Sequence, residues 1–108
     1  MTDPTNPSTK PNEFNGYNSV ITVKKEVLFE LKGYENAENV VLSGSFVDWD
    51  QQKLKMKKTE SGWKIPLQLT GGKHHYKFIV DGQWIRDPLN SVVEYDGNGH
   101  INSVIMVK

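Results

Sequence analysis

The segment Trp63–Leu69 constrains the fold more than any other part of the sequence. Its apolar residues alternate strictly with polar residues or proline: Trp63, Ile65, Leu67 and Leu69 against Lys64, Pro66 and Gln68. Because successive side chains of a strand point to opposite faces, this period of two predicts a strand with one buried face. Trp63 shares that face and is therefore assigned to the core. Pro66 has no amide hydrogen for a strand ladder, so we expect an edge position or a bulge there.

Other strands are indicated along the rest of the chain by β-branched and aromatic residues, with turn signals roughly every 8 to 12 residues. We expect them at Val20–Lys24, Val27–Leu31, Asn39–Phe46, His74–Val80, Gln83–Ile85 and Ile101–Lys108. Gly71-Gly72 is predicted to join the Trp63 strand to the His74 strand as a hairpin, and Asp81-Gly82 to form the next tight turn. No segment has helical periodicity over three turns. The sequence therefore predicts an all-β sandwich.

Composition limits the partners that such a domain could have. Among the 108 residues, 13 are Lys or Arg and 13 are Asp or Glu, so the formal net charge is zero. Nucleic acid and an anionic membrane are excluded as expected partners, because both attract a surplus of basic residues. The lysines at 53, 55, 57 and 58 are interpreted as one solvated face of a short strand. The absence of cysteine excludes disulfides and thiol nucleophiles.

The chain divides into two parts. Residues 1–18, which contain Pro4, Pro7 and Pro11, are rich in polar residues and are predicted to be a disordered tail or an interdomain linker. Residues 19–108 are predicted to form the β-sandwich domain. No apolar run is long enough for a membrane span, and the N-terminus has no signal peptide pattern. The location in the cell stays open, with the cytoplasm favoured.

None of the polar residues forms a recognisable catalytic or metal site. His74 and His75 are consecutive in a predicted strand, so they point to opposite faces and cannot share one metal. The carboxylates around the tryptophans, at Asp48, Asp50, Asp81 and Asp87, lie in turn contexts where Asp bonds to nearby backbone. The segment Asp96–His100 lacks most ligands of a calcium loop and is interpreted as a glycine-rich turn. We therefore predict no enzyme, no metal and no cofactor.

Two tryptophans follow strands directly and lie in polar turns, Trp49 after Phe46-Val-Asp and Trp84 after Asp81-Gly-Gln. They could pack on the rim of the sandwich, or they could form an exposed platform. An indole face complements the C–H face of a pyranose ring, whose hydroxyls then need polar partners. Lys77 alternates out of phase with Tyr76 and Phe78, so it points away from the face that those aromatics bury and could donate to a sugar.

Three segments carry a family resemblance. They are Val41-Leu-Ser-Gly-Ser-Phe-Val-Asp-Trp49, His75-Tyr-Lys-Phe-Ile-Val-Asp-Gly-Gln-Trp84 with Asp87-Pro88, and Ile101-Asn-Ser-Val-Ile-Met-Val-Lys108. Together they resemble the glycogen-binding domain of the β subunit of AMP-activated protein kinase, which belongs to the family 48 carbohydrate-binding modules. The resemblance covers about residues 25–108.

The resemblance implies an antiparallel, immunoglobulin-like β-sandwich that binds α-1,4-linked glucan without performing a reaction. It implies that Trp49 and Trp84 stack on glucose rings and that Lys77 bonds sugar hydroxyls. Asn102 matches a family asparagine, whereas His100 stands where the family has threonine and Asn98 where it has leucine. Because these two departures share one loop, the outer part of the site is expected to differ from the family.

Three functions stay open from the sequence. The first is non-catalytic binding of glycogen, starch or maltooligosaccharides, which would tether an attached domain or partner to the polysaccharide. The second is a protein-interaction or structural module that has lost sugar binding, for which the altered residues Asn98 and His100 argue. The third is a small glycosidase, which would have to release reducing sugar from starch.

Overall fold

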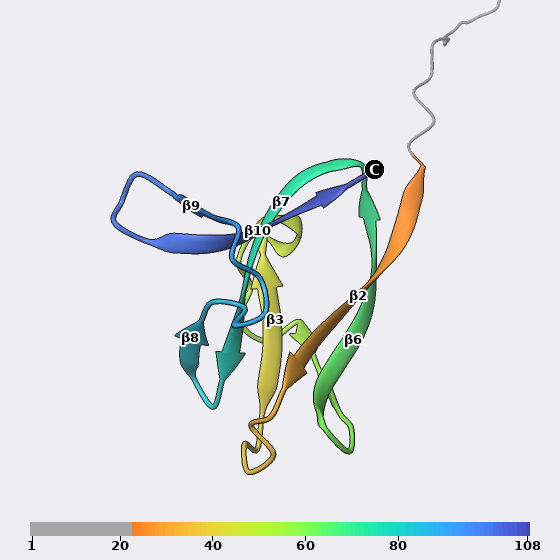
Figure 1. The fold of residues 1–108 in the computed structure, drawn as a ribbon, viewed down its shortest axis with the longest axis vertical. Helices are drawn as coiled ribbons and strands as arrows, with labels where there is room; N and C mark the ends of the chain where they lie inside the picture. The colour runs from red at the N-terminus through yellow and green to blue at the C-terminus, as the bar shows by residue number, and fades with distance from the viewer. Residues whose placement is uncertain (1–22) are drawn as a thin grey trace, which may run out of the picture.

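The computed structural model describes residues 23–108, so the tail predicted for residues 1–18 lies outside the described residues. The described chain folds into two antiparallel sheets packed face to face (Figure 1). The all-β, immunoglobulin-like sandwich expected from the sequence is confirmed. The larger sheet has strand order β4-β3-β7-β10-β9 with β8 added beside β7, and the smaller has the order β2-β6-β5.

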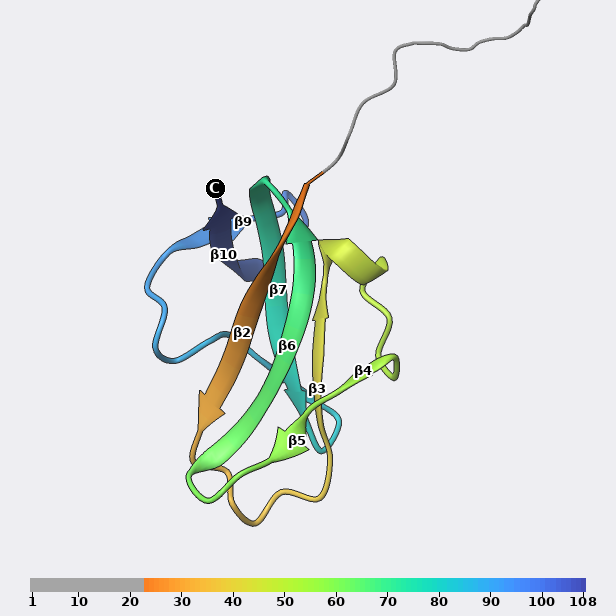
Figure 2. The ribbon, with the colours of Figure 1, turned by 90° about the vertical axis from the view of Figure 1, so that its right-hand side faces the viewer.

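The described strands are two to nine residues long. The larger sheet consists of β3 (Val40–Gly44), β4 (Leu54–Lys55), β7 (Gly72–Val80), β8 (Gln83–Ile85), β9 (Val93–Tyr95) and β10 (Ile101–Val107). The smaller sheet consists of β2 (Lys24–Lys32), β5 (Lys57–Lys58) and β6 (Gly62–Thr70). Within residues 23–108 the only helical segment is the 3-10 turn η1 (Ser45–Val47). Figure 2 shows β2 and β6 in front of β7, with β3 to their right.

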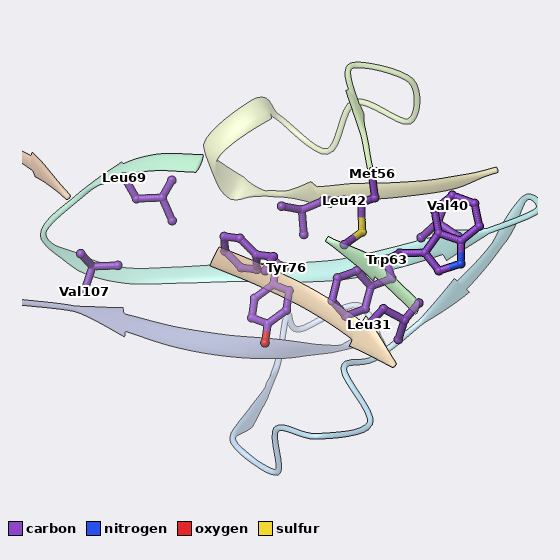
Figure 3. Close-up of a cluster of buried hydrophobic side chains, with 10 residues drawn as sticks. Leu31, Val40, Leu42, Met56, Trp63, Leu69, Tyr76 and Val107 are labelled. Carbon is purple, nitrogen blue, oxygen red and sulfur yellow. The ribbon is translucent and has the colours of Figure 1, made fainter. Parts of the chain in front are cut away.

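The core lies between the two sheets and contains side chains from both of them. Phe78 and Leu42 of the larger sheet are fully buried, and Phe29 and Leu31 of β2 meet them from the other layer. Trp63 belongs to this cluster with 7% of its surface exposed, which confirms the prediction made from strand phase (Figure 3). Its indole Nε1 donates to the carbonyl of Tyr34 at 3.0 Å, so burial leaves no unpaired donor.

The predicted hairpin at Gly71-Gly72 is wrong. β6 pairs with β2 and β5 in the smaller sheet, whereas β7 pairs with β3, β8 and β10 in the larger one. The turn therefore carries the chain from one layer to the other. Both strands still bury one face on the shared core, which is why the local pattern fitted a hairpin equally well. Gly72 has a φ of +116°, a conformation that favours glycine.

Three further strand predictions need correction. The strand expected to run to Phe46 ends at Gly44, because the next three residues form η1. A Cβ on Gly44 would lie 2.4 Å from the carbonyl oxygen of His75 and 2.7 Å from the ring of Phe46, so only glycine allows this close approach. The two strands expected at Val20–Lys24 and Val27–Leu31 are replaced by β2, and residues 20–22 lie outside the described residues. β9 was not predicted.

The lysine-rich segment is two strands rather than one. β4 lies in the larger sheet and β5 in the smaller sheet (Figure 2). Met56, the one residue between them in sequence, is buried. All four lysines are exposed as expected. β5 covers β6 only at Trp63 and Lys64, so β6 is paired on one side alone at Pro66. The edge position predicted for Pro66 is therefore confirmed.

Candidate functional site

The most distinctive feature of the outer face of the larger sheet is a pair of indoles. The ring centroids of Trp49 and Trp84 lie 6.2 Å apart and their planes are inclined at 52°. Trp84 lies on β8 with 39% of its surface exposed, and Trp49 is half-buried in the loop after η1. The two residues come from separate turns, and each turn is held by its own hydrogen bonds.

The Trp49 loop is fixed by the backbone on both sides of the indole. Asp48 and Trp49 both adopt left-handed conformations, with φ of 52° and 59°. The Trp49 amide donates to the carbonyl of Gly44 at 2.9 Å. After the tryptophan, Asp50 Oδ1 accepts from the amides of Gln52 at 2.8 Å and Lys53 at 2.9 Å. These bonds use the carboxylate for local structure, which agrees with the turn role expected from the sequence.

Trp84 is positioned by the tight turn at Asp81-Gly82, which is confirmed. Val80 pairs with Gln83 across this turn, and φ is 46° at Asp81 and 87° at Gly82. Positive φ at both central residues is typical of the two-residue hairpin turns whose twist matches their strands. Asp81 Oδ1 also accepts from the amide of Asn39 at 2.8 Å, which ties the turn to the start of β3.

The two indoles form one wall of a pocket of about 380 Å³. Its lining combines these apolar faces with a cation, a carboxylate, an imidazole and an amide: Trp49, Lys77, Trp84, Asp96, His100 and Asn102. Lys77 reaches the outer face because its neighbours Tyr76 and Phe78 are buried on the inner one. Such a lining suits an uncharged ligand that has both apolar surfaces and hydroxyl groups.

The β9–β10 loop closes one end of this pocket, and Asp96 organises it. Asp96 Oδ1 accepts from the amides of Asn98 at 2.7 Å and His100 at 3.2 Å. Its Oδ2 lies 3.0 Å from Nδ1 of His100. The bond from the Asn98 amide, followed by those from His100, holds the pKa of Asp96 below its usual range. The ionised carboxylate can only accept, so the proton of His100 is assigned to Nδ1, and Nε2 is left free of Asp96.

Of the six site residues taken from the sequence, five line this pocket: Trp49, Lys77, Trp84, His100 and Asn102. Asn98 does not belong to the lining, since it lies in the turn that Asp96 caps. Asp96 was missed as a pocket residue. The one available signal was the spacing Asp-Gly-Asn-Gly-His, in which a carboxylate precedes an imidazole by four residues across a turn.

The other two histidines and the buried Tyr76 have structural partners. His74 Nε2 lies 2.8 Å from the carbonyl of Thr70, and His75 Nε2 lies 2.8 Å from Glu94 Oε1. Tyr76 donates its hydroxyl to Asp87 Oδ2 at 2.7 Å. Burial, and then this bond, raises the pKa of Tyr76 above its usual value. Within residues 23–108, no group of three or more His, Cys, Asp or Glu side chains is arranged to hold a metal ion.

The sandwich and its outer pocket define a small β-sandwich ligand-binding domain. Residues 26–108 match the family described as the glycogen recognition site of AMP-activated protein kinase. The match covers most of the chain, and the chain belongs to this family.

The chain is also similar to parts of several named proteins. The chain is 44% identical over 73 residues to the chloroplastic PTST homolog 2 of Arabidopsis thaliana, which covers 67% of this chain and 13% of that protein. It is 42% identical over 71 residues to subunit beta-1 of 5'-AMP-activated protein kinase of Sus scrofa, covering 66% and 56%. It is 42% identical over 74 residues to human subunit beta-2, covering 68% and 26%. The chain thus spans only part of the length of these relatives.

A solved structure shares the fold. The maltogenic amylase from S. marinus superposes with a TM-score of 0.66 over 79% of this chain and 14% of the amylase, at 22% sequence identity. In the part of the chain that the structure describes, no helix is long and apolar enough to cross a membrane.

Proposed function

We propose that this domain binds α-1,4-linked glucan, such as glycogen, starch or maltooligosaccharides, and does not transform it. The observation that carries the proposal is the Trp49–Trp84 pair, which shares one pocket with Lys77 and Asn102. Indole planes inclined at 52° can each contact a different sugar ring of a chain that curves between them. Family membership and the names of the relatives support the same ligand class.

The polar lining supplies partners for the hydroxyls at the edges of the stacked rings. The Lys77 ammonium donates, and the Asn102 amide both donates and accepts. Asn102 lies on β10, where its strand position is fixed by pairing with Glu94 of β9. His100 stands where the family has threonine, and its Nε2 can accept from a hydroxyl while Asp96 holds Nδ1. An imidazole fixed in this way offers an acceptor where threonine would offer a hydroxyl that both donates and accepts.

The absence of a second carboxylate in the pocket argues against hydrolysis. Glycosidic cleavage generally needs a pair of Asp or Glu residues about 5 to 9.5 Å apart on either side of the bond. Asp96 is the only carboxylate among the lining residues that the structure describes, and its oxygens are engaged by Asn98 and His100. The domain therefore binds sugar without a catalytic acid and base.

The expected affinity is modest. Each aromatic contact contributes on the order of 1 kcal/mol beyond area burial, and hydrogen bonds to sugar compete with water. Against the cost of association, two such contacts correspond to micromolar to millimolar dissociation constants. A binder of this strength acts by raising the local concentration of an attached domain or partner near polysaccharide. In the longer relatives the matched segment is a small part of the protein, which leaves room for such an attached domain.

Retention on immobilised glycogen tests the proposal. Trp49→Ala and Trp84→Ala should each lose retention while the fold stays intact by circular dichroism. Tyr95→Ala is the matched control, because Tyr95 is 72% exposed and does not line the pocket. Unchanged retention of both tryptophan variants would contradict the proposal, and release of reducing sugar from starch would contradict its non-catalytic part.

A protein-interaction module that has lost sugar binding is the second candidate. The observation that favours it is a set of exposed apolar side chains along β9 and the segment before it: Leu89, Val92, Val93 and Tyr95. If this surface has replaced the sugar site, a titration with maltoheptaose should leave every indole signal unmoved. Movement of the indole signals would exclude this candidate.

A further inference from the structure

A second hollow lies on the outer face of the larger sheet, beside the tryptophan pair. It has a volume of about 410 Å³ and is lined by Asn39, Val41, Gln51, Gln52, Lys55, Ile79 and Gly82. We propose that a glucan chain bound at the Trp49–Trp84 pair continues into this second hollow, which forms an additional subsite for longer chains. The inference rests on the proposed function and extends the site by further sugar units.

A row of directly paired residues joins the tryptophan pair to the second hollow. Trp84 pairs with Ile79 across β8 and β7, Ile79 pairs with Val41 across β7 and β3, and Val41 pairs with Lys55 across β3 and β4. Directly paired residues project from the same face of a sheet. With strands about 4.8 Å apart, the row from Trp84 to Lys55 spans about 14 Å. The second hollow therefore lies on the same face as Trp84 and begins at Ile79, the strand partner of Trp84.

The floor of the second hollow is apolar and belongs to the outer face. Val41 and Ile79 are 8% and 5% exposed, respectively. Neither is part of the core cluster between the sheets, and both line the hollow instead. Because these two side chains leave little apolar surface free, a pyranose ring held in the hollow would touch them only over a small area and would depend mainly on the polar rim.

The rim of the hollow is made of amides and an ammonium group. Asn39, Gln51 and Gln52 supply donors and acceptors, and Lys55 supplies donors. Backbone bonds fix two of these residues, since the amide of Asn39 donates to Asp81 Oδ1 and that of Gln52 donates to Asp50 Oδ1. Their side-chain amides take part in no hydrogen bond to another residue in the range 23–108 that the structure describes. They are available for sugar hydroxyls.

The loop after η1 serves both sites. Trp49 lines the first pocket, and Gln51 and Gln52 of the same loop line the second hollow. A sugar chain that leaves the indole of Trp49 therefore meets the amides that follow it in sequence.

The chain-length dependence of binding tests this inference. Dissociation constants for maltotriose and maltoheptaose are measured by calorimetry for the wild-type chain and for Gln51→Ala/Lys55→Ala. The matched control is Gln68→Ala/Lys64→Ala, which removes the same residue types from exposed positions on β6 in the opposite sheet. Loss of one or two net hydrogen bonds should weaken maltoheptaose binding by about five- to tenfold. Maltotriose binding, and both constants of the control, should stay within about twofold.

The outcomes separate this inference from the proposed function. Unchanged maltoheptaose affinity in Gln51→Ala/Lys55→Ala would overturn the second subsite and leave the first pocket standing. Equal loss for both sugars would also overturn it, because the side chains would then act through the Trp49 loop. A wild-type chain that binds neither sugar would overturn the proposed function itself. As a second measurement, the side-chain amide signals of Asn39 and Gln52 should shift with maltoheptaose and stay fixed with maltotriose.

Discussion

Asp96 and His100 are joined twice within one turn: the carboxylate accepts from the His100 backbone amide at 3.2 Å and from its ring Nδ1 at 3.0 Å. This relationship places an imidazole at the mouth of the pocket with a defined tautomer. The two hydrogen bonds hold the His100 ring in a fixed position in the β9–β10 loop. Asp96 is therefore a positioning residue for the sugar site.

Removing the charge of Asp96 should therefore disturb the pocket without unfolding the sandwich. Asp96→Asn is expected to lower the affinity for maltoheptaose about three- to tenfold, because an amide holds His100 less firmly than a carboxylate does. The measurement is a calorimetric titration at neutral pH, together with the ring proton signals of His100. Glu60→Gln is the control, since Glu60 is exposed and lies outside the pocket. Equal affinities in both variants would show that Asp96 has no positioning role.

The pKa of the Asp96 carboxylate determines the pH below which its contribution to binding should be lost. The folded state lowers the pKa of Asp96 below its ordinary value of 3.8. A depressed pKa means that the contribution of the group is fully present above 3.8 and is lost as the pH falls through the folded pKa. The contribution of the Asp96 charge to sugar affinity should thus be lost only in acid below pH 3.8. A loss of the Asp96 contribution already at pH 6 would contradict the depressed pKa.

The hydrogen bonds of Tyr76 lead us to expect that the fold loses stability at high pH. Its hydroxyl donates to Asp87 and accepts from the side-chain amide of Asn90 at 3.1 Å, and its pKa is raised above the ordinary value of 10.0. Stability from this neutral phenol is complete below pH 10 and is lost as the pH rises through the raised pKa. Tyr76→Phe should lower the free energy of unfolding by about 1 to 3 kcal/mol at neutral pH. Urea denaturation measures it, and a stability equal to that of the wild type would argue against the bond.

Substitution of the buried Trp63 should destabilise the fold much more than substitution of the partly exposed Trp84. Trp63→Ala removes a buried side chain and should cost about 3 to 5 kcal/mol of unfolding free energy. Trp84→Ala should change the unfolding free energy by about 1 kcal/mol or less, because Trp84 is partly exposed. Both values come from urea titrations followed by circular dichroism. Similar losses for the two variants would mean that Trp84 is a packing residue rather than a binding one.

Adding a side chain at Gly44 should destabilise the fold, because the surrounding atoms leave no room for it. An added methyl group would clash with the carbonyl of His75 and the ring of Phe46, and it would displace the carbonyl that holds the Trp49 amide. Gly44→Ala should destabilise the fold by about 1 to 3 kcal/mol and weaken sugar binding. At Gly71 the nearest atom to an added methyl is 3.6 Å away, so Gly71→Ala is the control and should be tolerated. Equal thermal midpoints would contradict this account of Gly44.

The local sequence patterns correctly predicted the features that neighbouring residues determine, namely strand faces and a tight turn. Strand phase placed Trp63 in the core and Lys77 on the outer face, and the Asp81-Gly82 turn followed from residues that tolerate positive φ. The Gly71-Gly72 connection was misassigned, because a glycine turn between two amphipathic strands fits a hairpin and a link between sheets equally well. Only long-range pairing decides between them. Asp96 was missed as a pocket residue because β9 is three residues long and its pairing with β10 brings the loop to the tryptophans.

A titration with maltoheptaose that follows the three indole N–H signals by NMR tests the central claim most directly. The signals of Trp49 and Trp84 should shift in a saturable manner. That of Trp63, whose Nε1 is bonded to the carbonyl of Tyr34 inside the sandwich, should stay in place. Saturation without movement of the Trp49 and Trp84 signals, or no response from any indole, would contradict a glucan platform built on this pair.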